Sequence, residues 1–285
     1  MVDLHTHSNV SDGNLSPALL IGEAVKQGVR AIALTDHDTT NGLEIARKEA
    51  EKAKIRFIPG IEINIQTAGL GPGGEFHLLG LGIHRPSPAF VSAIEKLSRL
   101  RENRNQEILD NMRGMGIEAT LEDIQAFSGG HSLGRPHFAS FLISRKLAKD
   151  QKQAFARYLG AGKCLYVPKE GLNFEEAAAL IRESGGIPVL AHPMSLYIAW
   201  GRLPDVLKEL KNKGLAGIEA WHPTAKARSC RRLEELGKAL GFYITEGSDF
   251  HGSIRPERKL GFSNKGREIA DTVLEAIPEL AAPAG

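Results

Sequence analysis

Hydrophobic and polar positions alternate along the chain with two different periods. Seven short runs rich in apolar and β-branched residues predict strands. They lie at residues 2–7, 29–38, 55–65, 75–83, 187–193, 215–223 and 242–252. Stretches with apolar residues at helical spacing separate most of them, at 16–28, 43–53, 174–186, 203–214 and 228–241. Strands that alternate with helices predict an α/β fold with a parallel sheet, and seven such strands favour a closed barrel.

Turn and cap residues support several of these boundaries. Ser16 and Pro17 form an N-cap and N1 pair, and the apolar stripe that follows them stops at Gly28, which is typical of a complete helix. Glycines between residues 69 and 74 predict a hairpin-like loop between the third and fourth strands.

The pattern changes in the middle of the chain. Residues 89–116 and 135–147 are helical in pattern, and no strand-like run lies between them. We therefore predict a barrel domain formed by residues 1–88 and 164–285, interrupted by an all-helical insert at 89–163. The charge-rich first helix of the insert is predicted to be a solvated lid or cap.

Composition and charge narrow the function classes. The chain has 285 residues, a formal charge of +2 and 42% hydrophobic residues, which is typical of a globular protein. This near-balanced charge argues against non-specific binding of polyanions, so any nucleic acid must be recognised locally. The pattern shows no export signal, no run long enough to span a bilayer and no evident obligate protein partner.

Cysteine usage points to a reducing compartment. Cys164 and Cys230 lie far apart without a C-x-x-C partner, so neither a disulfide framework nor a thiolate metal site is indicated. A cytoplasmic protein fits this usage.

The histidines gather at the predicted strands. Of the ten histidines, only His84, His131 and His137 lie elsewhere. Functional residues of α/β barrels sit at the carboxyl ends of the strands, and every predicted strand provides an imidazole or a carboxylate, although His77 lies near the start of its strand. In chain order these are His5 and His7; Asp36, His37 and Asp38; Glu62; His77; His192; Glu219 and His222; and Asp249 and His251.

This pattern favours a polynuclear metal site over hydrogen-bonded structural histidines. His5 and His7 are two residues apart in a strand, so both rings leave the same face. Imidazoles and carboxylates without thiolates suit Mn, Fe or Zn. Nine candidate ligands are too many for one ion that also binds water, so two or three ions are predicted. The candidates are His5, His7, Asp12, His37, Glu62, His77, His192, Asp249 and His251.

The charge of such a site predicts its substrate class. Three dications would exceed the charge of Asp12, Glu62 and Asp249 by about +3, which a bridging hydroxide and a phosphate dianion would neutralise. Clustered ions also lower the pKa of bound water towards ~7. Hydrolysis of a phosphate ester is therefore expected.

Six segments in this order resemble the polymerase and histidinol phosphatase (PHP) family of metal-dependent phosphoesterases. They are DLHTHSNVSDG, LTDHDT, GIEIN, FHLLG, AHP and GSDFHG. The resemblance covers nearly the whole chain and implies a distorted seven-stranded (β/α)7 TIM-like barrel.

The family pattern also implies a distribution of ligands over three ions. It assigns His5, His7, Glu62 and Asp249 to the first metal, with Glu62 bridging to a second that His77 and His192 complete; Asp12, His37 and His251 hold the third. The implied catalytic group is a metal-bridging hydroxide that attacks phosphorus.

Within the family, HSLGRPHFA in the insert and IEAWHP at the sixth strand resemble the 3′,5′-nucleoside bisphosphate phosphatases, which are similar to 5′-to-3′ exoribonucleases acting on short RNA. The resemblance implies phosphate binding by Arg135, whose guanidinium can hold two oxygens, at the start of a helix with Pro136 at N1. His137 is expected to join it. An ordinary capped surface helix is the alternative.

Four residues near the candidate ligands have other predicted roles. His222 fits no ligand set and is a candidate acid or phosphate contact, with structural packing as the alternative. Asp36 and Asp38 flank His37 and are predicted to orient ligands from behind. Glu219 is interpreted as structural or as a similar supporting group.

Three other functions stay open. One is a different phosphoesterase of the family, acting on histidinol phosphate, a cyclic phosphodiester or RNA ends. An amidohydrolase also begins with H-x-H on a barrel strand, but would not need Asp12 and the TDHD segment. The third is a non-catalytic module that binds nucleic acid or stores metal.

Overall fold

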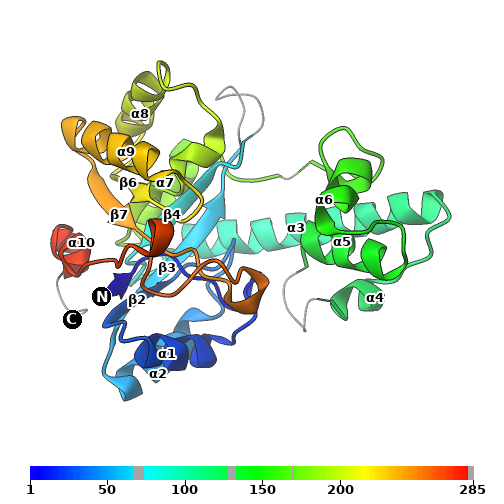
Figure 1. The fold of residues 1–285 in the computed structure, drawn as a ribbon, viewed down its shortest axis with the longest axis horizontal. Helices are drawn as coiled ribbons and strands as arrows, with labels where there is room; N and C mark the ends of the chain where they lie inside the picture. Colours follow the sequence, from blue (N-terminus) through cyan, green and yellow to red (C-terminus); the bar gives the residue numbers. More distant parts are fainter. Residues whose placement is uncertain (67–73, 128–132, 169, 282–285) are drawn as a thin grey trace. The chain divides into compact units, whose positions relative to one another are not determined.

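The computed structural model describes residues 1–66, 74–127, 133–168 and 170–281. Seven strands form one sheet in the order of the sequence. Their bounds are β1 Val2–Asp3, β2 Ala31–Leu34, β3 Arg56–Asn64, β4 His77–Leu81, β5 Ile187–Leu190, β6 Gly217–Trp221 and β7 Tyr243–Glu246. Thr6 beyond β1 bridges to Phe250 beyond β7. The sheet is therefore a nearly closed barrel (Figure 1).

One strand does not run as the prediction of a parallel sheet requires. β4 is antiparallel to both β3 and β5, whereas the other neighbouring pairs are parallel. The reason is the connection: no helix lies between β3 and β4 in the described part of residues 65–76, so the chain turns back as in a hairpin. His77 at the start of β4 thereby pairs with Asn64 at the end of β3.

The helices around the barrel follow the predicted periodicity. They are α1 Pro17–Lys26, α2 Leu43–Ala53, α7 Phe174–Glu183, α8 Leu203–Asn212 and α9 Ala227–Ala239. Ser16 caps α1 by accepting a hydrogen bond from the Leu19 amide, which confirms the predicted start. α1 and α2 pack together outside β2 and β3, and α9 covers β6 and β7 (Figure 1).

Alternate strand residues build two layers of core. Val2, Ala33, Ile58 and Val189 belong to an inner cluster, closed by the C-terminal segment that carries the short helices α10 Thr272–Glu275 and α11 Pro278–Ala281. Ile32 and Leu34 point the other way, into a cluster with α1 and α2. The amino-terminal half of the barrel interior is thus apolar and filled.

The carboxylate of Asp3 holds β1, the shortest strand of the sheet, in place. Its buried carboxylate accepts backbone N–H groups from His5 (3.3 Å), Ser248 (3.0 Å) and Gly261 (2.8 Å). These contacts join β1 to the segments after β7, where the barrel closes. Burial raises the pKa of Asp3 to about 6 although these hydrogen bonds act in the opposite direction.

Replacing Asp3 with alanine is expected to lower the free energy of unfolding by about 2 kcal/mol, because buried backbone N–H groups lose their acceptor. The loss is limited to this size because the variant no longer has to desolvate a carboxylate. Urea denaturation of the metal-free protein measures this. Asp205→Ala, whose carboxylate is 83% exposed, is the control. Equal stability of both variants would contradict the role of Asp3.

The chain divides into two compact units, residues 1–94 with 171–285 and residues 95–170; the sequence placed the boundaries at 88/89 and 163/164. Described elements of the second unit are helices: most of α3 Pro88–Gly114, then α4 Leu121–Gln125, α5 Arg135–Ser144, α6 Gln151–Ala154 and a π-helical turn at Phe155–Leu159. Ile108, Met112, Phe138 and Leu142 belong to its own apolar core. Within the described residues, no helix combines the length and apolar character that a membrane span needs.

Candidate metal centre

The carboxyl ends of the barrel strands bring the candidate ligands together. His5, His7 and Asp12 follow β1, His37 follows β2, and Glu62 lies in the second half of β3. The remaining four are His77 at the start of β4, His192 after β5, and Asp249 and His251 after β7. His77 reaches this end because β4 runs antiparallel to its neighbours.

Glu62 lies at the centre of the cluster. Its carboxylate is 1% exposed, and nitrogens of five imidazoles lie within 3.4 Å of its oxygens. Oε1 faces His77 Nδ1 (2.9 Å) and His192 Nε2 (3.0 Å), while Oε2 faces His5 Nε2 (3.4 Å), His7 Nε2 (3.2 Å) and His37 Nδ1 (3.1 Å). One carboxylate is therefore shared by five imidazoles from four strands.

Three sets of these side chains have the geometry to hold a metal ion. In each set the ligand atoms lie within 4.8 Å of one another. The sets are His7, Asp12, His37 and His251; His5, His7 and Asp249; and His37, Glu62 and His77. All donors are imidazole nitrogens or carboxylate oxygens, a chemistry that fits Mn, Fe or Zn.

The carboxylates of the cluster favour positive charge on the groups around them. Burial opposes ionisation of Asp12, Glu62 and Asp249, yet neighbouring imidazolium groups hold the pKa of each well below its usual range. In turn, burial opposes protonation of His7, but hydrogen bonds to Asp249 and Glu62 raise its pKa to about 10. Without cations, protons on His5, His7 and His192, whose pKa values are raised, supply part of this charge. Burial instead lowers the pKa of His37 to about 3 and keeps its imidazole neutral.

Glu219 supports two candidate ligands at once. Its Oε1 accepts from Nδ1 of His5 (2.9 Å) and its Oε2 accepts the backbone N–H of His192 (2.8 Å). A carboxylate behind the imidazole of His5 leaves Nε2 facing the cluster and makes it a stronger ligand. Gly247 allows this approach, since a Cβ there would lie 2.3 Å from Cβ of His5 and 2.7 Å from Oε1 of Glu219.

Asp36 and Asp38 hold segments of the chain that lie next to the candidate ligands. Asp36 accepts hydrogen bonds from the amide and hydroxyl of Ser8 (2.8 and 2.6 Å) and the hydroxyl of Ser11 (2.6 Å). Asp38 accepts from the amide and side chain of Asn64 (2.9 and 2.6 Å). Both therefore brace segments next to candidate ligands.

His222 and Arg258 hold one oxygen of Asp249. Nε2 of His222 lies 3.0 Å from Oδ2, and the guanidinium of Arg258 makes a short contact with the same atom and donates to the Asp249 carbonyl (3.0 Å). Oδ1 instead faces Nε2 of His7 at 3.2 Å. Asp249 also has a positive φ of 49°, a conformation that non-glycine residues adopt only when their surroundings enforce it.

Sequence reasoning missed Arg258. The arginine lies nine residues after Asp249, outside the segments that resemble the family and in a stretch without helical or strand periodicity. Only its burial, at 8% exposed, distinguishes it from the exposed Arg255 nearby.

Arg135 and His137 belong to the second unit. The guanidinium of Arg135 lies over the rings of Phe155 and Tyr166, 5.8 and 5.7 Å from their centroids. Nδ1 of His137 accepts the backbone N–H of Gly134 at 3.0 Å. His131 and Ser132, which begin the HSLGRPHFA segment, lie outside the described residues.

Comparison with known proteins decides the family. The model of the PHP domain matches residues 3–161, more than half of the chain. The chain belongs to the PHP family. It is an enzyme, a metal-dependent phosphoesterase, which confirms the resemblance seen in the sequence.

Curated relatives of this PHP protein act on different phosphate esters. A 5′-3′ exoribonuclease of Haemophilus influenzae is 32% identical over 249 residues, covering 87% of this chain and 89% of the relative. A 3′,5′-nucleoside bisphosphate phosphatase of Chromobacterium violaceum is 28% identical over 261 residues (91% and 90%). A phosphoribosyl 1,2-cyclic phosphate 1,2-diphosphodiesterase of Eggerthella lenta is 30% identical over 266 residues (91% and 97%).

Solved structures agree with the fold of this PHP protein. One from Chromobacterium violaceum, described as an amidohydrolase with bound sulfate, superimposes with a TM-score of 0.83 at 27% identity and covers 99% of this chain and 98% of that one. Another from Bifidobacterium adolescentis, described as a metal-dependent phosphoesterase, has a TM-score of 0.81 at 26% identity (97% and 95%).

Proposed function

We propose that the protein hydrolyses phosphate monoesters of small nucleotides, first of all the 3′-phosphate of nucleoside 3′,5′-bisphosphates, and trims short RNA from its 5′ end as a second activity. The observation that carries the proposal is the buried carboxylate of Glu62 surrounded by five imidazoles. The usage of cysteine favours the cytoplasm as the place of this activity.

We assign the ligands to three divalent ions, with manganese ahead of iron and zinc. His5, His7 and Asp249 would hold the first ion together with Glu62, which also reaches a second ion held by His77 and His192. Asp12, His37 and His251 would hold the third. The distances support the first two positions, because Oε1 of Glu62 faces His77 and His192 while Oε2 faces His5 and His7. His37 lies between sites: its Nδ1 is 3.1 Å from Oε2 of Glu62 and its Nε2 is 3.7 Å from Oδ2 of Asp12.

When bound, such ions activate a water molecule for attack on phosphorus and neutralise the charge of the phosphate. The chain itself positions the ligands that hold them. Glu219 orients His5, and the contacts of His222 and Arg258 with Oδ2 of Asp249 leave Oδ1 directed towards the cluster. The contact with Asp249 supports structural positioning by His222 ahead of its alternative as an acid or phosphate contact.

The helical unit supplies the proposed selectivity for nucleotides. Arg135 begins α5, and a guanidinium can hold two oxygens of one phosphate. His137 is the proposed second contact. The bisphosphate phosphatase among the relatives supports this substrate, and the exoribonucleases support RNA ends.

A direct experiment tests the proposed function. Protein reconstituted with Mn²⁺ is incubated with adenosine 3′,5′-bisphosphate, and inorganic phosphate is measured before and after chelation of the metal. Phosphate release that chelation abolishes and Mn²⁺ restores is the expected result. Absence of turnover with this substrate, together with turnover of another phosphate ester, would exclude the bisphosphate while retaining the phosphoesterase.

Arg135→Ala is expected to lower kcat/KM for the bisphosphate by about 100-fold, because a bidentate contact with a phosphate is worth roughly 3 kcal/mol in a desolvated site. Hydrolysis of an aryl phosphate, which lacks the second phosphate, is expected to change less than about threefold. Arg145→Ala, at the other end of α5, serves as the control. Equal losses on both substrates would remove the proposed role.

A cyclic phosphodiester is the second candidate substrate, and the Eggerthella lenta relative favours it. Parallel assays with a ribose 1,2-cyclic phosphate and with histidinol phosphate separate these substrates from the bisphosphate. Lactonase activity without phosphatase activity would instead support an amidohydrolase. Salt-sensitive RNA binding without any turnover would support a non-catalytic module.

Arg258→Met is expected to weaken Mn²⁺ binding by about tenfold, since residues that hold a ligand from behind contribute this much to metal affinity. It also removes one partner of a buried ion pair, which costs about 3 kcal/mol of stability in the metal-free protein. Titration with Mn²⁺ below the melting temperature separates the two effects. Arg258→Lys should recover part of the affinity, and Arg255→Met should leave it unchanged; a normal affinity in Arg258→Met would contradict the assignment.

A further inference from the structure

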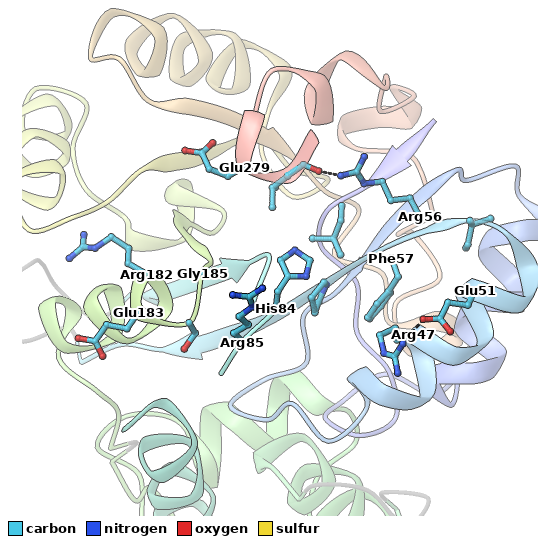
Figure 2. Close-up of a pocket in the computed structure, with 15 residues that line it drawn as sticks. Arg47, Glu51, Arg56, Phe57, His84, Arg85, Arg182, Glu183, Gly185 and Glu279 are labelled. Atoms are coloured by element: carbon cyan, nitrogen blue, oxygen red, sulfur yellow. Dashed lines mark hydrogen bonds and ion pairs between the residues drawn. The ribbon is translucent and has the colours of Figure 1, made fainter. Parts of the chain in front are cut away.

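The hollow at the start of β3 carries both signs of charge. It has a volume of about 1090 Å³ and lies within the first unit (Figure 2). Arg85 and Arg182 line it together with Glu51 and Glu183. Such a lining favours neither anions nor cations, so the hollow selects no class of ligand by charge. The contacts behind the candidate ligand His192 are more specific.

Ser195 lies directly behind the imidazole of His192. Its hydroxyl oxygen is 2.8 Å from Nδ1 of His192 and donates a hydrogen bond to the carbonyl of Glu75, also at 2.8 Å. On the other side of the ring, Nε2 lies 3.0 Å from Oε1 of Glu62. The ring of His192 is therefore held between a hydroxyl and the shared carboxylate of the cluster.

The carbonyl of Glu75 fixes the direction of these hydrogen bonds. A carbonyl oxygen can only accept, so the hydroxyl proton of Ser195 is committed to it and only lone pairs of Oγ remain for the imidazole. Nδ1 of His192 must then carry a proton to complete the contact. In a neutral imidazole this leaves the lone pair on Nε2, the nitrogen that faces Glu62 and the proposed second ion.

The backbone around Ser195 keeps this geometry. The amide of Glu75 donates to the carbonyl of Ser195 at 3.1 Å, so residues 75 and 195 are joined by two hydrogen bonds. Gly74 allows the approach, since a Cβ there would lie 2.2 Å from the carbonyl oxygen of Ser195. The amide of Ser195 in turn donates to the carbonyl of His192 at 2.8 Å. The hydroxyl is thus placed by its own backbone.

His192 has a backbone conformation that needs support. Its φ is 28°, in a region that non-glycine residues adopt only when their surroundings enforce it. Oε2 of Glu219 accepts the backbone N–H of His192 at 2.8 Å, but a contact with the backbone does not orient the ring. The hydroxyl of Ser195 contacts the ring itself and can orient it.

We propose that Ser195 is a positioning residue of the metal centre, which holds the proton of His192 on Nδ1 and thereby presents Nε2 to the second ion. The inference rests on the proposed function in that His192 holds an ion together with His77 and Glu62. A partner on the far nitrogen of a ligating imidazole fixes its tautomer and orientation, and its loss weakens metal binding by about 10- to 100-fold. Ser195 therefore has the role at the second ion that Glu219 has at the first.

Ser195→Ala tests the proposal, because it removes the hydroxyl and leaves the backbone contact with Glu75 in place. The full chain is titrated with Mn²⁺, and free manganese is measured by electron paramagnetic resonance at each step. One of the bound ions is expected to lose about tenfold or more in affinity. Ser195→Thr keeps a hydroxyl and should recover most of this loss.

A second measurement reports the tautomer directly. In the chain loaded with diamagnetic Zn²⁺, two-bond ¹⁵N–¹H NMR correlations show which nitrogen of His192 carries the proton. We expect a slowly exchanging proton on Nδ1 in the unsubstituted chain and faster exchange of this proton in Ser195→Ala. A residue that served only the packing of the turn would not change this exchange.

Ser144→Ala is the matched control. The hydroxyl of Ser144 also donates to a backbone carbonyl, that of Phe141 at 2.7 Å, but it lies in the second unit. Its loss should leave manganese affinity unchanged. Normal affinity in Ser195→Ala, an equal loss in Ser195→Thr, or a proton of His192 on Nε2 in the unsubstituted chain would each overturn the proposal.

These measurements do not depend on which ester is hydrolysed. Absence of turnover with the bisphosphate would contradict the proposed substrate, whereas unchanged manganese binding in Ser195→Ala would contradict the role of Ser195. The two failures are therefore distinguishable.

Discussion

Glu62→Gln is expected to reduce Mn²⁺-dependent phosphate release by about 10³-fold or more. Glutamine keeps the size of the side chain but replaces a shared anionic oxygen with an amide N–H₂ group, which cannot bind a cation. Because both oxygens of Glu62 face imidazoles of the cluster, one substitution affects two of the proposed ion positions. Phosphate release and bound manganese per chain are measured together.

Glu246→Gln is the matched control for this substitution. Glu246 is a carboxylate of similar burial, 4% exposed, at the end of β7, and it pairs with Arg267 and Ser263 instead of the imidazoles. Its replacement should leave activity and metal content within about twofold. Full metal content and near-normal turnover in Glu62→Gln would refute the central position of this residue.

Lowering the pH from 8 to 6 is expected to weaken Mn²⁺ binding by at least about 100-fold, which is tenfold per pH unit for each displaced proton. Burial opposes a charged His7, yet its hydrogen bonds to Asp249 and Glu62 raise the pKa of His7 to about 10 in the metal-free protein. An ion must therefore displace this proton throughout the range. Calorimetric titration in buffers of different ionisation enthalpy measures affinity and proton release together.

Protonation of His7 is also expected to change the stability of the metal-free protein, and the direction of the change follows from the pKa shift. Because the pKa of His7 is raised from 6.5 to about 10 in the folded chain, the charged imidazole stabilises the metal-free fold fully below pH 6.5. This contribution is lost as the pH rises through 10. Mn²⁺ binding that is independent of pH between 6 and 8, without proton release, would contradict both expectations.

Local patterns were sufficient for most of the secondary structure. α2 occupies residues Leu43–Ala53, the range that its helical periodicity predicts, and Ser16 caps α1 as expected. Helix caps and apolar periodicity depend on residues within a few positions of one another, so one sequence contains the information. The order of the candidate ligands along the chain was readable for the same reason.

Strand direction was only partly readable in this way. The hairpin-like loop expected between the third and fourth strands suits an antiparallel β4, although residues 67–73 of that loop lie outside the described residues. The parallel sheet expected from the alternation of strands and helices was wrong at β4, because pairing depends on which strands become neighbours. The antiparallel direction also explains why His77, at the start of its strand, lies 2.9 Å from Glu62.

By itself, the sequence determined the family, the βα rhythm and the residue types at the strand ends, since each of these is encoded in short segments. The tertiary structure alone decided which distant residues meet: the carboxylate of Asp3 with the backbone N–H of Gly261, Glu219 with His5, and Arg258 with Asp249. Such contacts join residues that share no periodicity. They form because closure of the barrel buries charged groups together, and a buried charge requires a partner.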